Sequence, residues 1–221
     1  MSHKRMSSNT AWANKLPILQ FSASKMVLSV AILLVSASLA LAEVKLPAII
    51  GDNMVLQQGR KVPVWGWADP GEEVMISVSW RGMSWAVTAD ADGKWIFKME
   101  PPEAGGPYEM TITGKNVVRI KNIMVGEVWV CSGQSNMQFA VSQAINSEQE
   151  IAGADYPNIR LFTVERKVAD QPQTDCKGSW TSCSPQTAPG FSAVAYFFGR
   201  ELHKNLGVPV GLIHTSWGGT P

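Results

Sequence analysis

The chain has 221 residues, enough for one large domain or two small ones that each bury a hydrophobic core. Its composition, 45% hydrophobic and 17% charged, is typical of globular proteins, and a net charge of +1 at pH 7 excludes a strongly basic nucleic-acid-binding protein. The three cysteines and three histidines show no metal-ligand spacing. We therefore expect no nucleic-acid partner and no metal site.

Residues 1–42 have the pattern of an export leader. They contain four basic residues and no acidic ones, an apolar run over residues 27–35, and small residues alternating up to Ala42. The apolar run is short for a membrane span, although an uncleaved anchor remains an alternative. We expect a signal peptide, an exported (periplasmic or extracellular) protein, and no stable membrane span after cleavage.

Export would permit a disulfide bond among the three cysteines. Their odd number leaves at least one thiol unpaired in a monomer. Cys176 and Cys183 could close a small loop, whereas Cys131 and Cys183 could instead be packed in a core. The pairing and the oligomeric state stay open.

Residues 43–122 are predicted to form an antiparallel β-sandwich. Apolar side chains alternate with polar or small ones over residues 74–80, 95–99 and 108–112, which gives each strand one buried face. Turn residues such as the Asp-Gly pair at 92–93 separate these segments. No helix-length periodic stretch interrupts them.

Tryptophans are unusually frequent in this predicted β-domain. They could stack on sugar rings, which would make the domain a carbohydrate-binding module, or they could fill the core. We favour the core for Trp80 and Trp95, which are in register with aliphatic neighbours. The tryptophans concerned are Trp65, Trp67, Trp80, Trp85 and Trp95.

From residue 123 the pattern changes to alternating strands and helices. This order predicts a parallel, doubly wound sheet, and the long polar connection within it is of the kind that carries function or covers a site. The expected elements are a strand at 123–131, a helix at 136–152, a strand at 158–164, the connection at 165–189, a helix at 191–206 and a strand at 208–213.

Residues 128–137 (VWVCSGQSNM) place a small nucleophile, Ser135, directly after a strand. Gly133 would allow a sharp turn, and a following helix N-terminus would favour negative charge at the carboxyl edge of the sheet. A serine before a helix is more often only an N-cap. Met137 also stands where the G-x-S-x-G elbow requires glycine.

Longer strings resemble the sialate O-acetylesterase family, a branch of the SGNH (GDSL-like) hydrolases. The resemblance spans roughly residues 44–221 and implies a three-layer α/β/α fold for residues 123–221. It also implies a cofactor-free serine esterase that removes O-acetyl groups from sialic acid or other acetylated carbohydrates. The strings that carry it are residues 51–57 (GDNMVLQ), 64–66 (VWG), 126–137 (GEVWVCSGQSNM), 191–202 (FSAVAYFFGREL) and 213–221 (IHTSWGGTP).

By this resemblance Ser135 is the nucleophile. Its own N–H and an amide of Gly218 or Gly219 would stabilise the oxyanion. Gln134 and Asn136 would hydrogen-bond the turn or the substrate. Ser132 is the rival nucleophile, but it matches a turn position.

The general base is missing from the sequence. His203 falls on the polar side of a helix and is expected to be solvated, and His214 is expected to be a packed strand residue. In the family the base lies in an Asp-x-x-His block that follows a Gln-Gly-Glu block, and the sequence contains neither. We therefore expect an N-terminal fragment with an incomplete α/β/α domain, an open sheet edge and little activity. The alternative is a non-catalytic exported carbohydrate-binding protein.

Overall fold

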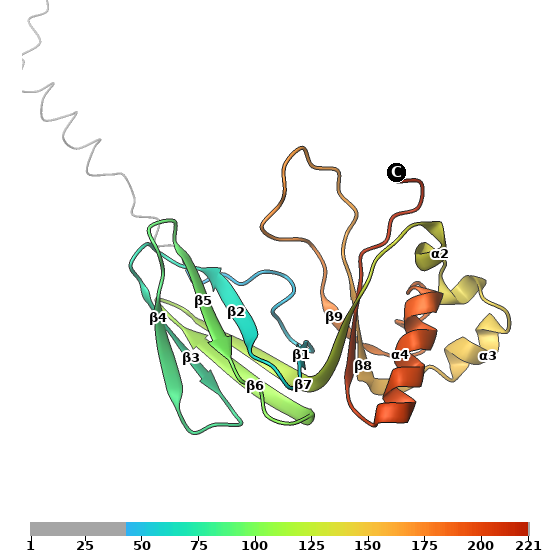
Figure 1. Cartoon of the computed structure of the whole chain (residues 1–221), viewed down its shortest axis with the longest axis horizontal. Coiled ribbons are helices and arrows are strands. Elements are labelled where there is room, and N and C mark those ends of the chain that lie inside the picture. Colours follow the sequence, from blue (N-terminus) through green and yellow to red (C-terminus); the bar gives the residue numbers. More distant parts are fainter. Residues whose placement is uncertain (1–42, 221) are drawn as a thin grey trace, which may run out of the picture. The chain divides into compact units, whose positions relative to one another are not determined.

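The computed structural model describes residues 43–220, so the predicted leader, residues 1–42, lies outside the described residues (Figure 1). Within the described part no helix is long and apolar enough to cross a lipid bilayer. The elements in chain order are β1 Val55–Gln57, β2 Val62–Trp67, β3 Glu73–Val78, β4 Ser84–Thr88, β5 Lys94–Met99, β6 Gly105–Thr113, β7 Val117–Cys131, α2 Ser135–Gln138, the 3-10 helix η1 Val141–Gln143, α3 Ser147–Ala152, β8 Tyr156–Thr163, β9 Trp180–Cys183, α4 Ala193–Leu206 and β10 Val210–His214.

The longest strand, β7, belongs to two parts of the chain. Residues 117–125 pair antiparallel with β6, residues 124–126 pair parallel with β1, and residues 127–131 pair parallel with β10. The result is an eight-stranded mixed sheet in the order β4-β3-β6-β7-β10-β8-β9, with β1 attached to β7. The expected domain boundary at residues 122–123 therefore falls inside one continuous strand. Below, residues 43–126 are called the β part and residues 127–220 the α/β part.

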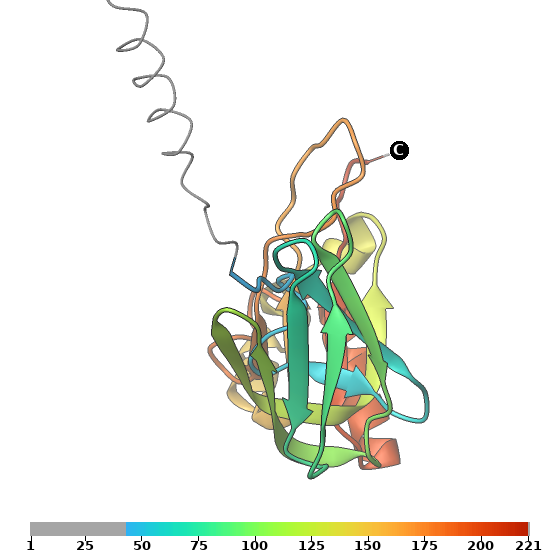
Figure 2. The ribbon, with the colours of Figure 1, turned by 90° about the vertical axis from the view of Figure 1, so that its left-hand side faces the viewer.

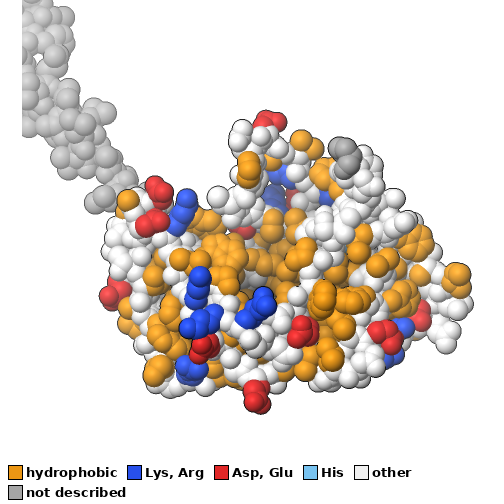
Figure 3. Space-filling model, in the orientation of Figure 1, with side chains coloured by type: hydrophobic (Ala, Val, Ile, Leu, Met, Phe, Trp, Pro, Cys, Tyr) orange, Lys and Arg blue, Asp and Glu red, His pale blue; other side chains and the backbone are white. Residues whose placement is uncertain are grey.

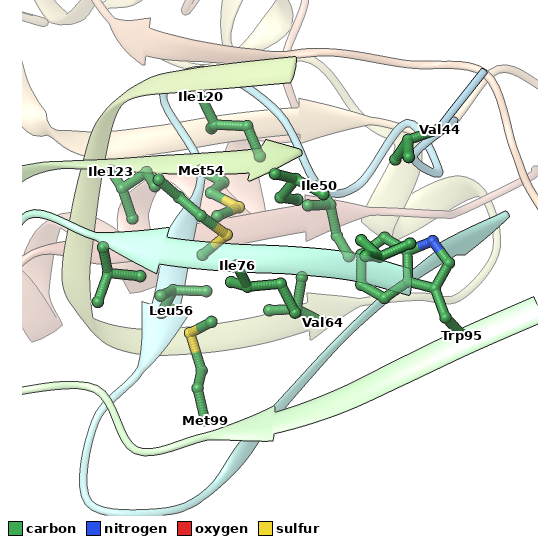
Figure 4. Packing of buried hydrophobic residues seen from close by; sticks show 14 of the residues in the cluster. Val44, Ile50, Met54, Leu56, Val64, Ile76, Trp95, Met99, Ile120 and Ile123 are labelled. Carbon is green, nitrogen blue, oxygen red and sulfur yellow. The ribbon is translucent and has the colours of Figure 1, made fainter. Parts of the chain in front are cut away.

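Strands β2 and β5 form a separate antiparallel pair. Together with the large sheet they surround one hydrophobic cluster, to which Val64 of β2, Ile76 of β3, Trp95 of β5 and Ile120 of β7 contribute (Figure 4). The predicted alternation is confirmed in β3, where every second side chain is buried. Trp95 is 3% exposed, which confirms its assignment to the core. Hydrophobic burial on this scale is the main term that stabilises such a fold.

The same cluster continues into the α/β part. Phe162 of β8 and Trp180 of β9 belong to it, and their rings lie 5.3 Å apart. The Trp180 Nε1–H donates a hydrogen bond of 2.8 Å to the carbonyl oxygen of Ile49. The two parts therefore share a core rather than meeting across a polar linker.

A buried arginine connects the parts as well. Arg160 of β8 is 3% exposed, and its two terminal nitrogens donate to the side-chain oxygens of Asn53 and Asn122, each at 3.1 Å. Asn122 also donates to Asn53 at 2.7 Å. Burial lowers the pKa of Arg160, and within residues 43–220 its Nε has no hydrogen-bond partner and no carboxylate forms an ion pair with it. The two asparagines therefore supply most of the compensation for a buried charge.

The α/β part has a parallel core of β7, β10 and β8, with β9 antiparallel at the edge. The predicted helix at 191–206 is confirmed as α4, which Ser192 caps through its hydroxyl and which ends at Gly207 in the left-handed region. Figures 1 and 2 show the helices of the described part on one face of these strands, while the β part lies on the other. The expectation of helices on both faces is thus not met within residues 43–220.

The predicted single helix at 136–152 is wrong. The segment breaks into α2, η1 and α3, with Ala140 and Ala144 extended and Asn146 left-handed. Val141 N–H donates to the Phe191 carbonyl at 3.0 Å, and Ala140 forms a bridge with Ser192. These contacts to the start of α4 replace helical hydrogen bonds, so tertiary pairing overrides the local preference. The predicted connection at 165–189 likewise contains a strand, β9.

Candidate functional site

Ser135 lies where the sequence predicts, in a turn that follows β7. Gly133 has φ +150°, and an added Cβ there would lie 3.3 Å from the Cβ of Met137, so this position favours glycine. The Ser135 side chain is exposed, and no hydrogen-bond partner engages its hydroxyl within residues 43–220. The hydroxyl is accessible to a substrate.

The helix that begins at Ser135 is too short for the predicted dipole effect. α2 has four residues, and Gln134 makes no side-chain cap. A macrodipole sums over aligned peptides, so a single turn contributes little. Any stabilisation of negative charge at Ser135 must therefore come from individual N–H groups.

Parallel pairing of β7 with β10 carries the C-terminal glycines to the same edge of the sheet. The pairing ends with His214 beside Cys131, and two further hydrogen bonds extend it, from Thr215 N–H to the Cys131 carbonyl and from Trp217 N–H to the Gly133 carbonyl, each at 3.0 Å. A Cβ built on Gly218 would lie 3.3 Å from the Cα of Ser135. The structure thus brings Ser135 and Gly218 into contact range.

The two glycine amides differ in their surroundings. Gly218 N–H donates to the side-chain oxygen Oε1 of Gln138 at 2.6 Å, so in this structure that donor is occupied. Gly219 has φ +79° and no atom near an added Cβ, and its N–H has no partner within residues 43–220. Sequence reasoning missed Gln138, although its position three residues after Ser135 places it on the same side of a helical turn.

The remaining predicted site residues are close to Ser135 in sequence and exposed. Gln134 Nε2 donates to the Thr220 carbonyl at 2.5 Å, which ties the turn to the segment after β10. Asn136 has no side-chain hydrogen bond within the described part, and Ser132 is also exposed. The roles predicted for Gln134 and Asn136 toward substrate stay predictions.

His214 is buried, as predicted, and its ring makes a hydrogen bond and an aromatic contact. Its Nε2 lies 2.5 Å from the Ser216 Oγ, and its ring packs edge-on against Phe191 at 5.4 Å. Arg166 donates from Nε to the Ser216 carbonyl at 3.1 Å. Burial and, secondarily, the charge of Arg166 lower the pKa of His214. A small cavity of about 240 Å³ lies beside this pair and is lined by Thr163, Val164, Glu165, Arg166, His214 and Ser216.

His203 is half-buried rather than solvated, which corrects the expectation for it. Its Nδ1 lies 2.7 Å from the Val208 carbonyl oxygen, which ties the last turn of α4 to the segment that leads into β10. Both histidines of the described part are therefore bonded to groups other than Ser135.

The three cysteines are free thiols, Cys131 and Cys183 buried and Cys176 half-buried. Burial and the nearby charge of Asp155 raise the pKa of Cys183 to about 12, which keeps this thiol protonated. No cluster of side chains in residues 43–220 could hold a metal ion.

Comparison with known proteins finds sialate O-acetylesterases among the relatives of this chain. The chain is 33% identical to a sialate O-acetylesterase of Rattus norvegicus over 78% of this chain and 35% of that protein. It is 34% identical to a sialate O-acetylesterase of Homo sapiens over 78% of this chain and 36% of that protein. No family model matches the chain.

The fold is similar to a crystal structure of a carbohydrate acetylesterase from Xanthomonas citri, with a TM-score of 0.77 and 35% identity over 81% of this chain and 41% of that one. The resemblance to sialate O-acetylesterases is thus confirmed as homology. The chain spans about a third of the length of the curated relatives it matches.

Proposed function

We propose that this homologue of sialate O-acetylesterases carries the nucleophile and the oxyanion donors of a carbohydrate O-acetylesterase. The observation that supports the proposal best is the contact of Gly218 with Ser135. It brings an exposed hydroxyl beside a turn in which the Gly219 N–H has no partner within residues 43–220, and acyl transfer requires such a donor near its nucleophile.

In the proposed reaction the Ser135 Oγ attacks the carbonyl carbon of an O-acetyl group. The carbonyl oxygen gains negative charge, and the N–H groups of Ser135 and Gly219 can donate to it, since neither has a partner within residues 43–220. Collapse of this intermediate breaks the bond between the carbonyl carbon and the sugar oxygen, and that oxygen takes up the proton lost by the Ser135 hydroxyl. The sugar leaves as an alcohol and an acetyl ester remains on Ser135. Water then releases acetate.

Gln138 decides whether Gly218 takes part. While its Oε1 accepts from the Gly218 N–H, that amide cannot donate to a substrate oxygen. The amide oxygen of Gln138 thus occupies the position of an acceptor, and a substrate carbonyl would have to displace it.

Both steps need a general base, and neither histidine of residues 43–220 is hydrogen-bonded to Ser135. The two described histidines are bonded to Val208 and Ser216. We therefore propose that this chain by itself acylates slowly and deacylates more slowly still.

The test is mass spectrometry of the chain after incubation with p-nitrophenyl acetate. We expect an acetyl group to accumulate on the peptide that contains Ser135, to persist in Ser132→Ala, and to be absent in Ser135→Ala. Equal acetylation of that peptide in Ser135→Ala would refute the nucleophile. Rapid steady-state turnover that depends on Ser135 would refute the proposal that this chain lacks a general base.

The substrate class proposed is an O-acetylated sugar, sialic acid or another carbohydrate, because relatives of both descriptions match the chain. We further propose that residues 43–122 form a β-sandwich and that residues 123–221 form part of an SGNH-like domain. Export, with cleavage near residue 42, is proposed from the leader pattern. Recovery of a periplasmic or secreted form whose N-terminus lies near residue 43 would test it.

A further inference from the structure

A cavity on the β part lies among residues to which the esterase reaction assigns no role. It has a volume of about 450 Å³, within the roughly 300–1,000 Å³ typical of ligand sites. It is lined chiefly by Trp65, Trp67, Ile96, Asp90, Lys94 and Thr174. None of these residues contacts Ser135, Gly218 or Gln138.

The aromatic side of the cavity is the outer face of the β2–β5 pair. Trp65 pairs with Ile96 and Trp67 with Lys94, and directly opposed residues of an antiparallel pair share a face. The neighbouring Val64 is 1% exposed and lies in the core, whereas Trp95, 3% exposed, belongs to the core and also lines the inner end of the cavity. Trp65 and Trp67 are half-buried and Ile96 is 57% exposed. The strand pair therefore carries two half-buried indoles on its outer face, of which Trp65 also packs against the hydrophobic cluster.

Polar groups stand beside the indoles. The Asp90 Oδ1 accepts from the N–H groups of Asp92 at 2.9 Å and Lys94 at 2.8 Å, which fixes the carboxylate. Its Oδ2 has no partner within residues 43–220, and neither has the Thr174 hydroxyl. The Lys94 ammonium makes only a long, exposed contact of 4.0 Å with Asp92. Acceptors and donors are thus available at the cavity.

The opposite wall is the loop between β8 and β9, and this loop is held in place. The Asp175 Oδ1 accepts from Ala48 N–H at 2.9 Å, and Glu165 N–H donates to the Lys177 carbonyl at 2.8 Å. The cavity is therefore bounded on two sides by anchored structure. Figure 3, in the orientation of Figure 1, shows hydrophobic side chains gathered across the middle of the visible surface, with Lys and Arg side chains beside them.

We propose that this cavity binds a pyranose unit of a neutral glycan. A pyranose ring has an apolar C–H face, which suits the faces of Trp65 and Trp67, and a rim of hydroxyls, which suits a carboxylate, an ammonium and a hydroxyl group. The charges of Asp90 and Lys94 offset one another, so the cavity offers an anionic sugar no net attraction to compensate for desolvation of its carboxylates. The site would hold glycan independently of the chemistry at Ser135.

The experiment is titration calorimetry of the purified chain with neutral oligosaccharides (xylohexaose, cellohexaose and mannohexaose) and with oligogalacturonate as the anionic probe. We expect at least one neutral probe to bind and oligogalacturonate not to bind. Trp67→Ala should raise the dissociation constant about tenfold or more, since a stacked indole face is lost. Ile96→Lys, at an exposed position, should block the cavity without disturbing the fold.

The matched control is Trp129→Ala, which removes an indole 44% exposed on β7 and outside the cavity. It should change the dissociation constant by less than about twofold, the scale of a neutral surface change. Ser135→Ala should bind as the parent does, which separates this site from the proposed reaction. The proposal is overturned if no neutral probe binds, if only the anionic probe binds, or if Trp67→Ala and Ile96→Lys bind as tightly as the parent.

Discussion

The β part and the α/β part differ in how they complete their hydrophobic cores. The β part surrounds its own cluster with two sheets, so its apolar strand faces meet each other. The α/β part has helices on one face of β7, β10 and β8, and its other face is covered through Phe162 and Trp180 by the cluster of the β part. The candidate active site therefore sits on strands that depend on a neighbouring region for half of their cover.

The contact between β7 and the segment before β10 should be the most sensitive point of this arrangement. A Cβ on Gly126 would overlap the backbone carbonyl oxygen of Pro209, which cannot move aside as a flexible side chain can. We expect Gly126→Ala to cost about 3 kcal/mol or more of unfolding free energy, measured by urea denaturation. Gly82→Ala, where an added Cβ meets nothing within 4 Å, is the control and should change stability little. Similar losses in both variants would contradict the close approach.

Loss of a hydrogen bond to the buried Arg160 should have the second-largest effect on stability. Asn53→Ala removes one acceptor from its guanidinium and a partner from Asn122, leaving a buried charge less compensated. We expect a loss of about 2–3 kcal/mol in chemical denaturation. Asn205→Ala, at an exposed helix position, should cost far less. If the two variants were equally stable, Arg160 would not couple the parts.

Because of the buried His214, the stability of the α/β part should depend on pH. Its folded pKa lies below the unfolded value of about 6.5, so below that pH the unfolded state binds more protons. Its contribution to stability is therefore complete above pH of about 6.5 and declines as the pH falls, by at most about 1.4 kcal/mol per pH unit. His214→Asn should flatten this decline between neutral and mildly acidic pH. An unchanged slope in thermal or urea unfolding would show that His214 titrates alike in both states.

The smallest effect on stability is expected at the free edge of β7. Within residues 43–220, the strand from 127 to 131 pairs with β10 alone, and side chains of Gln57 and Gln58 bond only its first two residues, Glu127 and Val128. Val130 is 66% exposed. Val130→Lys should alter stability by no more than about 0.5 kcal/mol but reduce self-association in light scattering. Ile145→Lys, at a 90% exposed loop position, should leave association unchanged. If Ile145→Lys reduced self-association and Val130→Lys did not, the self-associating surface would lie away from the edge of β7.

The sequence correctly predicted those strands and helices whose conformation follows from their own apolar periodicity. The alternation of β3 and the helical spacing of α4 were both confirmed, because each buries one face against a large partner. The segment 136–152 failed because hydrogen bonds to residues 189–192, distant in sequence, decide its conformation. The sharing of β7 was equally out of reach, since no local signal distinguishes one long strand from two short ones.

For the candidate site, sequence reasoning placed Ser135 after a strand and Gly218 after another. The parallel register that unites them follows from the topology. The contact of Gln138 with Gly218 joins residues that are 80 positions apart in the sequence. The contact of His214 with Ser216 depends on how the two side chains are oriented at the end of β10. Such contacts have no periodic signature.

An uninterrupted β7 has a thermodynamic consequence for the whole described region. Unfolding of its first half would remove cover from β8 and β9, and unfolding of its second half would expose the apolar side of the strands in the β part. Calorimetry should accordingly record one cooperative heat-absorption peak, with calorimetric and van't Hoff enthalpies in agreement. Expressing the chain as two separate pieces, divided at residue 122, should then yield two insoluble polypeptides instead of two folded domains.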